Sequence, residues 1–401
     1  MYTGWETQQG RRLFERPNIV AVCYVLVSLQ SFTVVSASGF AVKTSHLLAG
    51  ALAIGLLGRG LRIPTEVRPV LGYILFAVVG TLLPYLLVTA PHPLYANYLF
   101  VLLLVPVVSS YANLAEYRTV LSGVKRGAAA VAGYSAINIL ANFDQVRESR
   151  THTLASGARA QVDGLVYSGG VNLESSWVAL GSAFFIARPR EFFLYSVPAL
   201  TVCLSLSSRA GLLIWAICAI LAAREINWNP RLVGLAFVLM PFCVLVVLAY
   251  GDSLTGLNVV QRFGAIGSEP GSLGRLAMWQ NAGSAIANSP FLGYGIGNEV
   301  AAIVRTSGVP ILDQNPHNLV ISNLLALGVL GGVAWLLACI LQLLSLRARP
   351  EAFVYFASFL AASLIEFRGA DVPLYFVIAA LGGAYMSDSR RLERKVSPLI
   401  S

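Results

Sequence analysis

Hydrophobic residues form about twelve long runs along this chain, separated by shorter polar segments. The runs lie at 19–37, 40–57, 69–89, 93–112, 122–142, 173–188, 190–205, 209–223, 231–250, 317–345, 350–367 and 371–387. Most suit a helix that crosses the roughly 30 Å hydrocarbon core of a bilayer. Backbone groups cannot stay unpaired in lipid, and the short alternating segments of a membrane barrel are missing. The pattern therefore predicts an all-α, polytopic integral membrane protein, with residues 1–401 as a single transmembrane domain of about 12 helices.

Composition agrees with this class, because 56% of the 401 residues are hydrophobic and only 12% are charged. Soluble domains carry about 25% charged residues. The first run follows arginines and could pass for a secretory signal peptide. Because further runs follow at once, we interpret it as an uncleaved signal anchor.

The basic residues predict an orientation. With the N-terminus in the cytoplasm, 19 of the 28 Lys and Arg residues fall on the cytoplasmic side, as the positive-inside rule requires. Both termini are then cytoplasmic in a multi-pass protein. The net charge of +9 is mostly an orientation signal and an attraction to membrane lipids. No basic stripe interleaved with aromatics is present, so no nucleic-acid partner is expected.

This orientation leaves two long loops on the far side of the membrane. They are a shorter loop at 143–172 and a long one at 251–316, in which we expect a helix lying along the membrane surface. The basic residues on that side are mostly arginine, whose fork of donors fits phosphate oxygens better than lysine does. For Arg147 and Arg150 two interpretations stay open, substrate contacts or ion pairs with nearby acidic residues. The acidic residues of these loops include Asp144, Glu148, Asp163, Asp252, Glu269 and Glu299.

Two other arginines have more distinctive settings. Arg209 lies in Ser207-Ser-Arg-Ala-Gly at the outer mouth of a predicted span, where a charge is costly unless it reaches the surface or a polar cavity. Arg275 begins the predicted surface helix, in which Leu276, Trp279 and Ile286 are spaced to share one face. The simpler interpretations are a side chain reaching to the interface and an ordinary contact with lipid phosphates.

Asn288-Ser-Pro should end that helix, and the Gly293-Tyr-Gly-Ile-Gly segment that follows predicts a tight turn back toward the membrane. A nucleotide site is not expected there, because the glycines neither follow a strand nor open a strong helix. Next comes His317, after Pro316, near the start of the 317–345 run. The positive end of the helix dipole disfavours imidazolium and favours the neutral base. A lone histidine is nonetheless more often structural than catalytic.

Several kinds of chemistry lack their residues in this sequence. The histidines form no metal-spaced cluster, so no metal is expected. There is no P-loop and no Gly-x-Ser-x-Gly elbow. All five cysteines lie in apolar runs, which predicts neither a disulfide nor a cysteine metal site.

The order of these motifs resembles the O-antigen ligase and O-antigen polymerase superfamily. The matching segments are Ser208-Arg-Ala-Gly, Gly274-Arg-x-x-x-Trp, Ser289-Pro-Phe-Leu-Gly-x-Gly, Pro316-His-Asn and Gly328-Val-Leu-Gly, roughly over 205–335. The resemblance implies a fold similar to the glycosyltransferase C class, with short helices in a periplasmic loop region. It also implies a bacterial inner-membrane enzyme that uses no cofactor and acts on the periplasmic face. The donor would be O-antigen linked to undecaprenyl diphosphate.

The resemblance assigns roles to individual residues. Arg209 and Arg275 match the arginines that hold the diphosphate, and His317 matches the histidine that acts as base or orients the acceptor hydroxyl. Asn318, beside it in the motif, is a further candidate contact. A ligase, which uses a lipid A-core acceptor, is preferred over a polymerase, and a protein O-oligosaccharyltransferase ranks third. From a different class, a non-catalytic flippase or transporter of lipid-linked glycans is the alternative.

Overall fold

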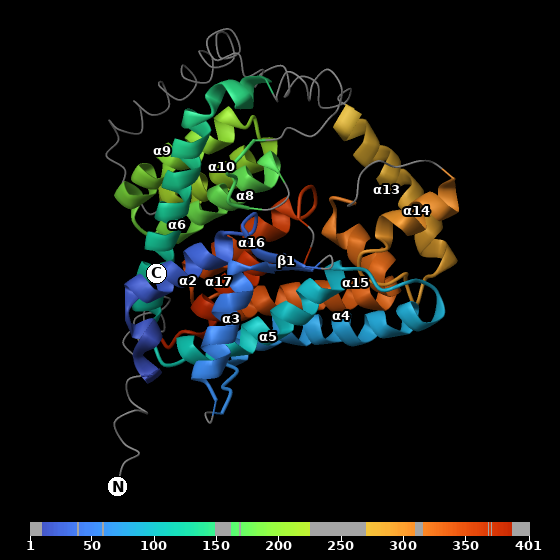
Figure 1. Ribbon diagram of the computed structural model, residues 1–401, viewed down its shortest axis with the longest axis horizontal. Helices are drawn as coiled ribbons and strands as arrows, with labels where there is room; N and C mark the ends of the chain where they lie inside the picture. Colours follow the sequence, from blue (N-terminus) through green and yellow to red (C-terminus); the bar gives the residue numbers. More distant parts are fainter. Residues whose placement is uncertain are drawn as a thin grey trace, which may run out of the picture.

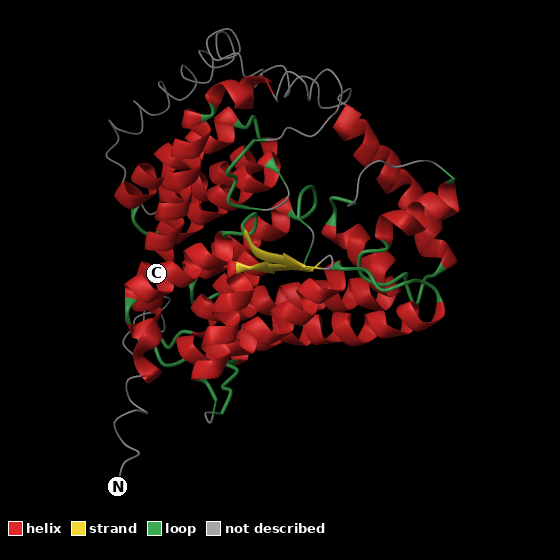
Figure 2. Cartoon of the chain, viewed as in Figure 1, coloured by secondary structure: helices red, strands yellow, loops and turns green. Residues whose placement is uncertain are grey.

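The structure, a computed structural model, describes residues 10–37, 40–57, 60–148, 162–167, 170–224, 270–308, 316–367, 369 and 371–386. Most of these residues lie in helices, and the sheet within these ranges is one two-stranded hairpin (Figure 1, Figure 2). The predicted all-helical class therefore agrees with the structure, apart from that hairpin.

The elements follow the predicted hydrophobic runs closely. The first half of the chain forms η1 (Gly10–Glu15), α2 (Pro17–Ser28), β1 (Thr33–Ala37), β2 (Phe40–Lys43), α3 (Thr44–Gly55), η2 (Thr65–Val67), α4 (Arg68–Leu87), α5 (Leu94–Ala112) and α6 (Tyr117–Ala141). The second half forms α8 (Val171–Leu180), η3 (Gly181–Phe185), α9 (Pro189–Ser205), α10 (Arg209–Arg224), α13 (Pro270–Asn288), α14 (Glu299–Ser307), α15 (Leu319–Leu346), α16 (Pro350–Ala362) and α17 (Val372–Gly383). Eleven of the twelve predicted runs contain one of these helices, and the run at 231–250 lies outside the described residues.

Three of the described helical segments are long and apolar enough to cross a bilayer. They are Thr65–Leu87, Leu94–Ala112 and Leu319–Leu346. Shorter apolar helices of 10–17 residues accompany them, among them Pro17–Ser28 and Val372–Gly383. The structure thus supports a helical membrane protein, while the number of twelve spans stays a prediction.

Helix α17 is packed on several sides by other helices, among them α5 and α2, and its residues from Val372 to Gly383 are all buried. Next to it, α2 and α6 approach each other closely at two glycines of α6. A Cβ on Gly123 would lie 2.6 Å from the Pro17 carbonyl oxygen, and one on Gly127 would lie 2.9 Å from the Ala21 carbonyl oxygen. Small residues at such crossings let helix backbones meet, which is a common way to join helices within a bilayer.

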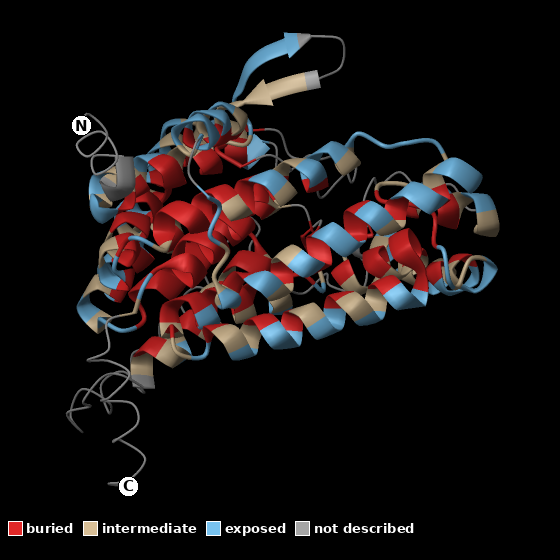
Figure 3. Cartoon of the chain, turned by 90° about the horizontal axis from the view of Figure 1, so that it is seen from below, coloured by how far each residue is buried: buried red, intermediate tan, exposed pale blue. Residues whose placement is uncertain are grey.

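The hairpin corrects the first two predicted spans. Helix α2 ends at Ser28 rather than near residue 37, and β1 pairs antiparallel with β2 where helix was expected. Thr33, Val34 and Val35 are β-branched and so favour a strand, although their hydropathy equals that of a helical span. The hairpin projects from the helices, with β1 largely exposed (Figure 3).

Segments predicted to share a side of the membrane contact each other. At the predicted cytoplasmic end, the Arg349 Nη2 atom lies 3.1 Å from Glu66 Oε1 and Lys125 Nζ lies 2.7 Å from Glu191 Oε2. At the predicted outer end, Asn298 donates a hydrogen bond of 3.1 Å to the Ala90 carbonyl. These three contacts fit the predicted assignment of their segments to the two sides of the membrane.

The four cysteines in the described residues, Cys23, Cys203, Cys218 and Cys339, are free and buried. Cys243 lies outside the described residues.

Candidate active site

The glycine-rich segment after α13 packs its backbone against a break in α15. Gly328 has a non-helical conformation inside α15, with φ of 67°. The Val329 amide donates a 2.7 Å hydrogen bond to the Pro290 carbonyl, while the Tyr294 and Gly295 amides donate to the Leu325 and Ala326 carbonyls at 2.8 Å each. The segment therefore satisfies backbone groups that the helix break leaves open.

Glycine is required on both sides of this contact. A Cβ on Gly293 would lie 2.5 Å from the Ala326 carbonyl oxygen, and one on Gly328 would lie 2.5 Å from the Phe291 carbonyl oxygen. Both residues also have positive φ, which disfavours any larger side chain. The Gly-x-Gly-x-Gly pattern forms a turn, as predicted from the sequence, and the structure adds that this turn is packed tightly against α15.

His317 lies just before α15, and hydrogen bonds fix the backbone before and after it. Pro316 is buried, and its carbonyl accepts a 2.7 Å hydrogen bond from Trp279 Nε1. The Leu319 amide donates to the Ser363 carbonyl at 2.8 Å, at the end of α16. Helix α15 begins at Leu319 rather than at Pro316, so His317 stands one residue ahead of the helix cap. It is near the helix start, as predicted, but outside the helix.

The backbone of His317 is strained. In the described part of the chain, the non-glycine residues with positive φ are Ser207 at 48° and His317 at 53°. Such conformations cost about 1–3 kcal/mol and gather at functional sites. Both residues belong to the sequence motifs described above. Ser207 lies two positions before Arg209, and His317 lies in the Pro316-His-Asn motif. The positive φ of these two residues marks the candidate site in a way that the sequence alone does not.

Helix α13 carries Arg275 and Trp279 one turn apart, in the helix predicted there. Its buried face is formed by Met278, Ala282 and Ala285, which pack against α14 and α15. Trp279 and Ile286 lie at the margin of this face, but Leu276 is 49% exposed. The expected placement of this helix along the membrane surface stays a prediction. The helix ends at Asn288, as predicted.

Arg275 points at the end of α16. Its Nη1 atom donates a 3.2 Å hydrogen bond to the Ile365 carbonyl, and its Nη2 atom lies 3.7 Å from Glu366 Oε2. The Glu366 side chain is only 5% exposed, whereas that of Arg275 is 25% exposed. A guanidinium has five N–H donors, so these contacts orient the group and leave donors for a ligand. The ion pair links helices far apart in sequence, and no sequence spacing indicated it.

Arg209 is the first residue of α10, in a turn made of small residues. The Ser208 hydroxyl oxygen accepts a 3.2 Å hydrogen bond from the Gly211 amide, which satisfies an open donor in the first turn of the helix. A Cβ on Gly211 would lie 2.8 Å from Cys203 Sγ, so α10 starts close against α9. Arg209 is partly exposed at this junction. The motif therefore sets one arginine at a rigid helix start.

These elements form one cluster around the end of α16. Trp279 joins α13 to the residue before His317, Arg275 joins α13 to α16, and Leu319 joins α15 to α16. On the other side, α10 packs against α8 and α16, and Trp177 of α8 lies 4.8 Å from Phe367, ring to ring. The surroundings of Arg275 and His317 are thus directly joined. Helix α10 packs against α16 as well, with Cys218 Sγ 3.9 Å from Ser358 Oγ.

The other candidate residues have varied settings. Arg147 is 56% exposed, and its Nη2 atom lies 3.6 Å from Asp144 Oδ1, in keeping with the ion-pair interpretation. Arg150 lies outside the described residues. Asn318 caps α15, because its Oδ1 atom accepts a 3.1 Å hydrogen bond from the Ile321 amide. Its side-chain oxygen has a structural role next to His317.

Glu299 is one of the carboxylates that the sequence offered as possible ion-pair partners of the outer arginines. Within the described part of the chain it makes no ion pair, and its Oε1 atom accepts a 3.1 Å hydrogen bond from the Gly297 amide. The residue is 8% exposed, and burial raises the pKa of its carboxyl from 4.5 to about 7. A buried carboxyl that titrates near neutrality beside the glycine turn is a candidate functional group.

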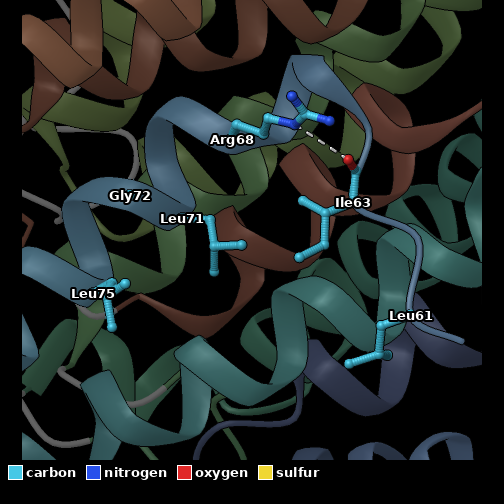
Figure 4. Close-up of a pocket in the computed structure, with 6 residues that line it drawn as sticks. All are labelled: Leu61, Ile63, Arg68, Leu71, Gly72 and Leu75. Carbon is cyan, nitrogen blue, oxygen red and sulfur yellow. Dashed lines mark hydrogen bonds between the residues drawn. The ribbon is translucent and has the colours of Figure 1, made fainter.

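Two further observations concern metal ligands and the hollows of the structure. Among the described residues, no group of three or more His, Cys, Asp and Glu side chains could hold a metal ion. A hollow of about 470 Å³ lies far from this cluster, at the start of α4 (Figure 4). Its walls are Leu61, Ile63, Leu71 and Leu75, and Arg68 donates a 3.4 Å hydrogen bond to the Ile63 carbonyl. With apolar walls and a single cation, this hollow lacks the groups for catalysis.

The fold and site define a helical membrane protein with an arginine and histidine cluster at one end of its bundle. A family model described as O-antigen ligase matches residues 194–336. The predicted resemblance, placed at roughly 205–335, is confirmed over this segment, which contains Arg209, Arg275 and His317. Over these residues the chain is similar to O-antigen ligases. No curated protein matches the chain.

Proposed function

We propose that this protein is a metal-independent, inverting glycosyltransferase that moves O-antigen polysaccharide from undecaprenyl diphosphate to a sugar hydroxyl of lipid A-core. The observation that carries the proposal is the junction at the end of α16. There the Trp279 bond to Pro316, the Arg275 contacts with Ile365 and Glu366, and the Leu319 bond to Ser363 bring a fixed guanidinium and a strained histidine into one cluster.

The arginines would stabilise the leaving group. Negative charge grows on the diphosphate as its bond to the sugar breaks, and preorganised donors aimed at that charge lower the barrier. Arg275 is held by the α16 carbonyl and by Glu366, so its orientation is set before the substrate binds. Arg209, at the start of α10, would provide the second guanidinium. Arginines would thus fill the place that a metal ion takes in other transferases.

His317 would accept the proton of the acceptor. The acceptor oxygen forms a bond to the anomeric carbon while the bond from that carbon to the diphosphate oxygen breaks. The leaving undecaprenyl diphosphate keeps the electron pair, and the hydroxyl proton passes to the imidazole. Attack from the face opposite the leaving group inverts the anomeric centre. The Nδ1 atom of His317 is shielded from solvent, so Nε2 would be the edge that meets the hydroxyl.

We infer that this cluster faces the periplasm, with the chain in the bacterial inner membrane and both termini in the cytoplasm. The distribution of basic residues supports this orientation. The contacts between Asn298 and Ala90, and between Arg349 and Glu66, also fit it, because each joins segments assigned to one side.

Complementation tests the proposal directly. A strain that lacks its O-antigen ligase would carry this chain, and its lipopolysaccharide would be separated on a gel. Banded O-antigen attached to lipid A-core supports the proposal. Arg275→Ala and His317→Ala should abolish the bands, while Arg305→Ala should retain them. Arg305 is a suitable control because it is an exposed arginine of the neighbouring α14.

The same experiment separates the competing functions. Longer glycans that stay on undecaprenyl diphosphate, without attachment to lipid A, would indicate a polymerase. A flippase would need no base, so it would keep its full effect in the His317→Ala variant. Either result would overturn the ligase assignment.

A further inference from the structure

The base of the hairpin and the loop before α8 enclose a second hollow, of about 270 Å³. The segments meet where the Ser31 amide donates a 2.9 Å hydrogen bond to the Val166 carbonyl. The hollow is lined by Ser31, Phe32, Val162, Asp163, Gly164, Leu165, Tyr167 and Gly170. The loop before α8 belongs to the predicted periplasmic loop at 143–172, whereas Ser31 and Phe32 lie within the first predicted span, 19–37. Its lining residue Tyr167 stacks on Trp177 with 5.7 Å between the ring centroids, and Trp177 in turn contacts Phe367, next to Glu366.

The loop that forms the floor is firmly held. Asn138 Nδ2 donates a 2.9 Å hydrogen bond to the Asp163 carbonyl. Gln145 bonds Asp163 twice, donating to its carboxylate at 3.1 Å and accepting from its amide at 3.3 Å. Gly164 has φ of 71°, and a Cβ there would lie 2.8 Å from Asn138 Oδ1. The loop is thus a rigid support rather than a free connection.

The lining offers three kinds of group. Asp163 is exposed and supplies carboxylate acceptors. The Ser31 hydroxyl can donate, and Gly170, which precedes α8, provides no side-chain cap for the amides of the first turn. Phe32 is 40% exposed and presents an apolar ring. Donors, acceptors and an aromatic ring together fit a polyol that has one apolar face.

We propose that this hollow binds one neutral sugar ring of a glycan substrate, with the ring stacked on Phe32 and its hydroxyls bonded to Asp163. The volume is below the roughly 300–1,000 Å³ of sites for drug-sized ligands, so it suits a single ring. The Asp163 carboxylate repels acidic sugars and phosphates. The sugar can belong to the acceptor core or to the donor glycan. Its identification as substrate rests on the proposed function.

Direct binding tests the site without any transfer reaction. Full-length protein in nanodiscs would be mixed with the methyl glycosides of glucose, galactose or N-acetylglucosamine, and saturation-transfer difference NMR would detect contact. We expect a signal from at least one glycoside, and its loss in Phe32→Ala and Asp163→Asn. Val34→Ala is the matched control, because Val34 is 50% exposed on the same hairpin and does not line the hollow. No wild-type signal, or equal signals in wild type and Phe32→Ala, would overturn the proposal.

Transfer kinetics identify the source of the sugar. An aromatic contact contributes roughly 0.5–1.5 kcal/mol, so Phe32→Ala should raise one KM up to about tenfold with little change in kcat. A raised KM for the acceptor indicates that a sugar of lipid A-core occupies the hollow. A raised KM for the donor indicates that a sugar of the O-antigen occupies it. Unchanged values for both would contradict the proposal and leave the proposed function intact. If the protein binds the sugar but transfers no glycan, the sugar site would stand and the proposed transferase function would be wrong.

Discussion

The indole nitrogen of Trp279 donates a 2.7 Å hydrogen bond to the carbonyl oxygen of Pro316, the residue that precedes His317. Arg275 lies one helical turn before Trp279. Helix α13 therefore positions both the Arg275 guanidinium and the backbone that precedes His317. Long loops usually tolerate change, but here the loop holds a strained residue in place. The predictions below separate what positions these groups from what performs the chemistry.

Trp279→Phe should slow glycan transfer without unfolding the protein. The variant keeps an aromatic ring but removes the donor to Pro316. A neutral hydrogen bond contributes about 0.5–1.5 kcal/mol, so we expect a roughly two- to tenfold lower rate. Initial rates on purified protein would measure it. Trp335→Phe, further along α15, is the control, and equal rates in both variants would contradict the role of the Trp279 bond.

Arg275→Lys should behave almost like Arg275→Ala. Lysine keeps the charge but cannot contact the Ile365 carbonyl, the Glu366 carboxylate and a diphosphate with one planar fork. Bonds to charged groups contribute about 1.5–3 kcal/mol, so kcat/KM should fall roughly ten- to hundredfold. Arg305→Lys should retain wild-type values. A fully active Arg275→Lys variant would show that charge alone is sufficient.

Different replacements of His317 should separate folding from catalysis. Asparagine tolerates positive φ, whereas a β-branched residue does not. His317→Asn should therefore keep the wild-type melting temperature, and His317→Val should be less stable by about 1–3 kcal/mol. Both should lack transfer activity because neither side chain is a base. Activity in the asparagine variant would assign His317 a role in positioning alone.

Gly328→Ala should destabilise the protein strongly. The new Cβ would lie 2.5 Å from the Phe291 carbonyl oxygen at a backbone with φ of 67°. Strain of this kind costs about 1–3 kcal/mol before any clash is counted. Gly283→Ala is the matched control, because nothing lies within 4 Å of a Cβ there. That variant should be neutral or stabilised by up to about 1 kcal/mol, and similar melting curves for both would contradict the packing turn.

Glu299 should make stability depend on pH. Burial raises the pKa of its carboxyl from 4.5 to about 7, so the folded protein binds this proton more tightly than the unfolded chain. Its contribution to stability is therefore full below about pH 4.5, declines as the pH rises to 7, and is absent above. The decline is on the order of 3 kcal/mol. Glu299→Gln should remove it, as seen in the difference between wild-type and variant melting temperatures at pH 5, 6 and 8. Parallel curves would show that Glu299 does not carry this dependence.

The sequence predicts helices well where hydropathy and proline agree. Pro189 and Pro350 begin α9 and α16 at the predicted starts, because proline suits the first turn of a helix. The hairpin was missed because Val34 and Val35 are as apolar as residues of a span. Only their β-branching favours a strand, and such local preference is weak beside tertiary context.

The site could be predicted in part. Motif order indicated Arg209, Arg275 and His317, and the structure joins the surroundings of the last two. The partnership of Arg275 with Glu366 could not be predicted, because it depends on how α13 docks on α16. The burial of Glu299 was missed for the same reason. Sequence spacing shows which residues share an element, but not which elements meet.

The break at Gly328 divides α15 into two parts that have different neighbours. Residues 319–327 carry the turn that follows His317 and are bonded to the glycine-rich segment, whereas the rest of the helix belongs to the bundle. Leu319, which follows His317 closely, is also bonded to Ser363 at the end of α16. The position of His317 therefore depends on how the glycine-rich segment docks on α15 as well as on how α15 packs against α16.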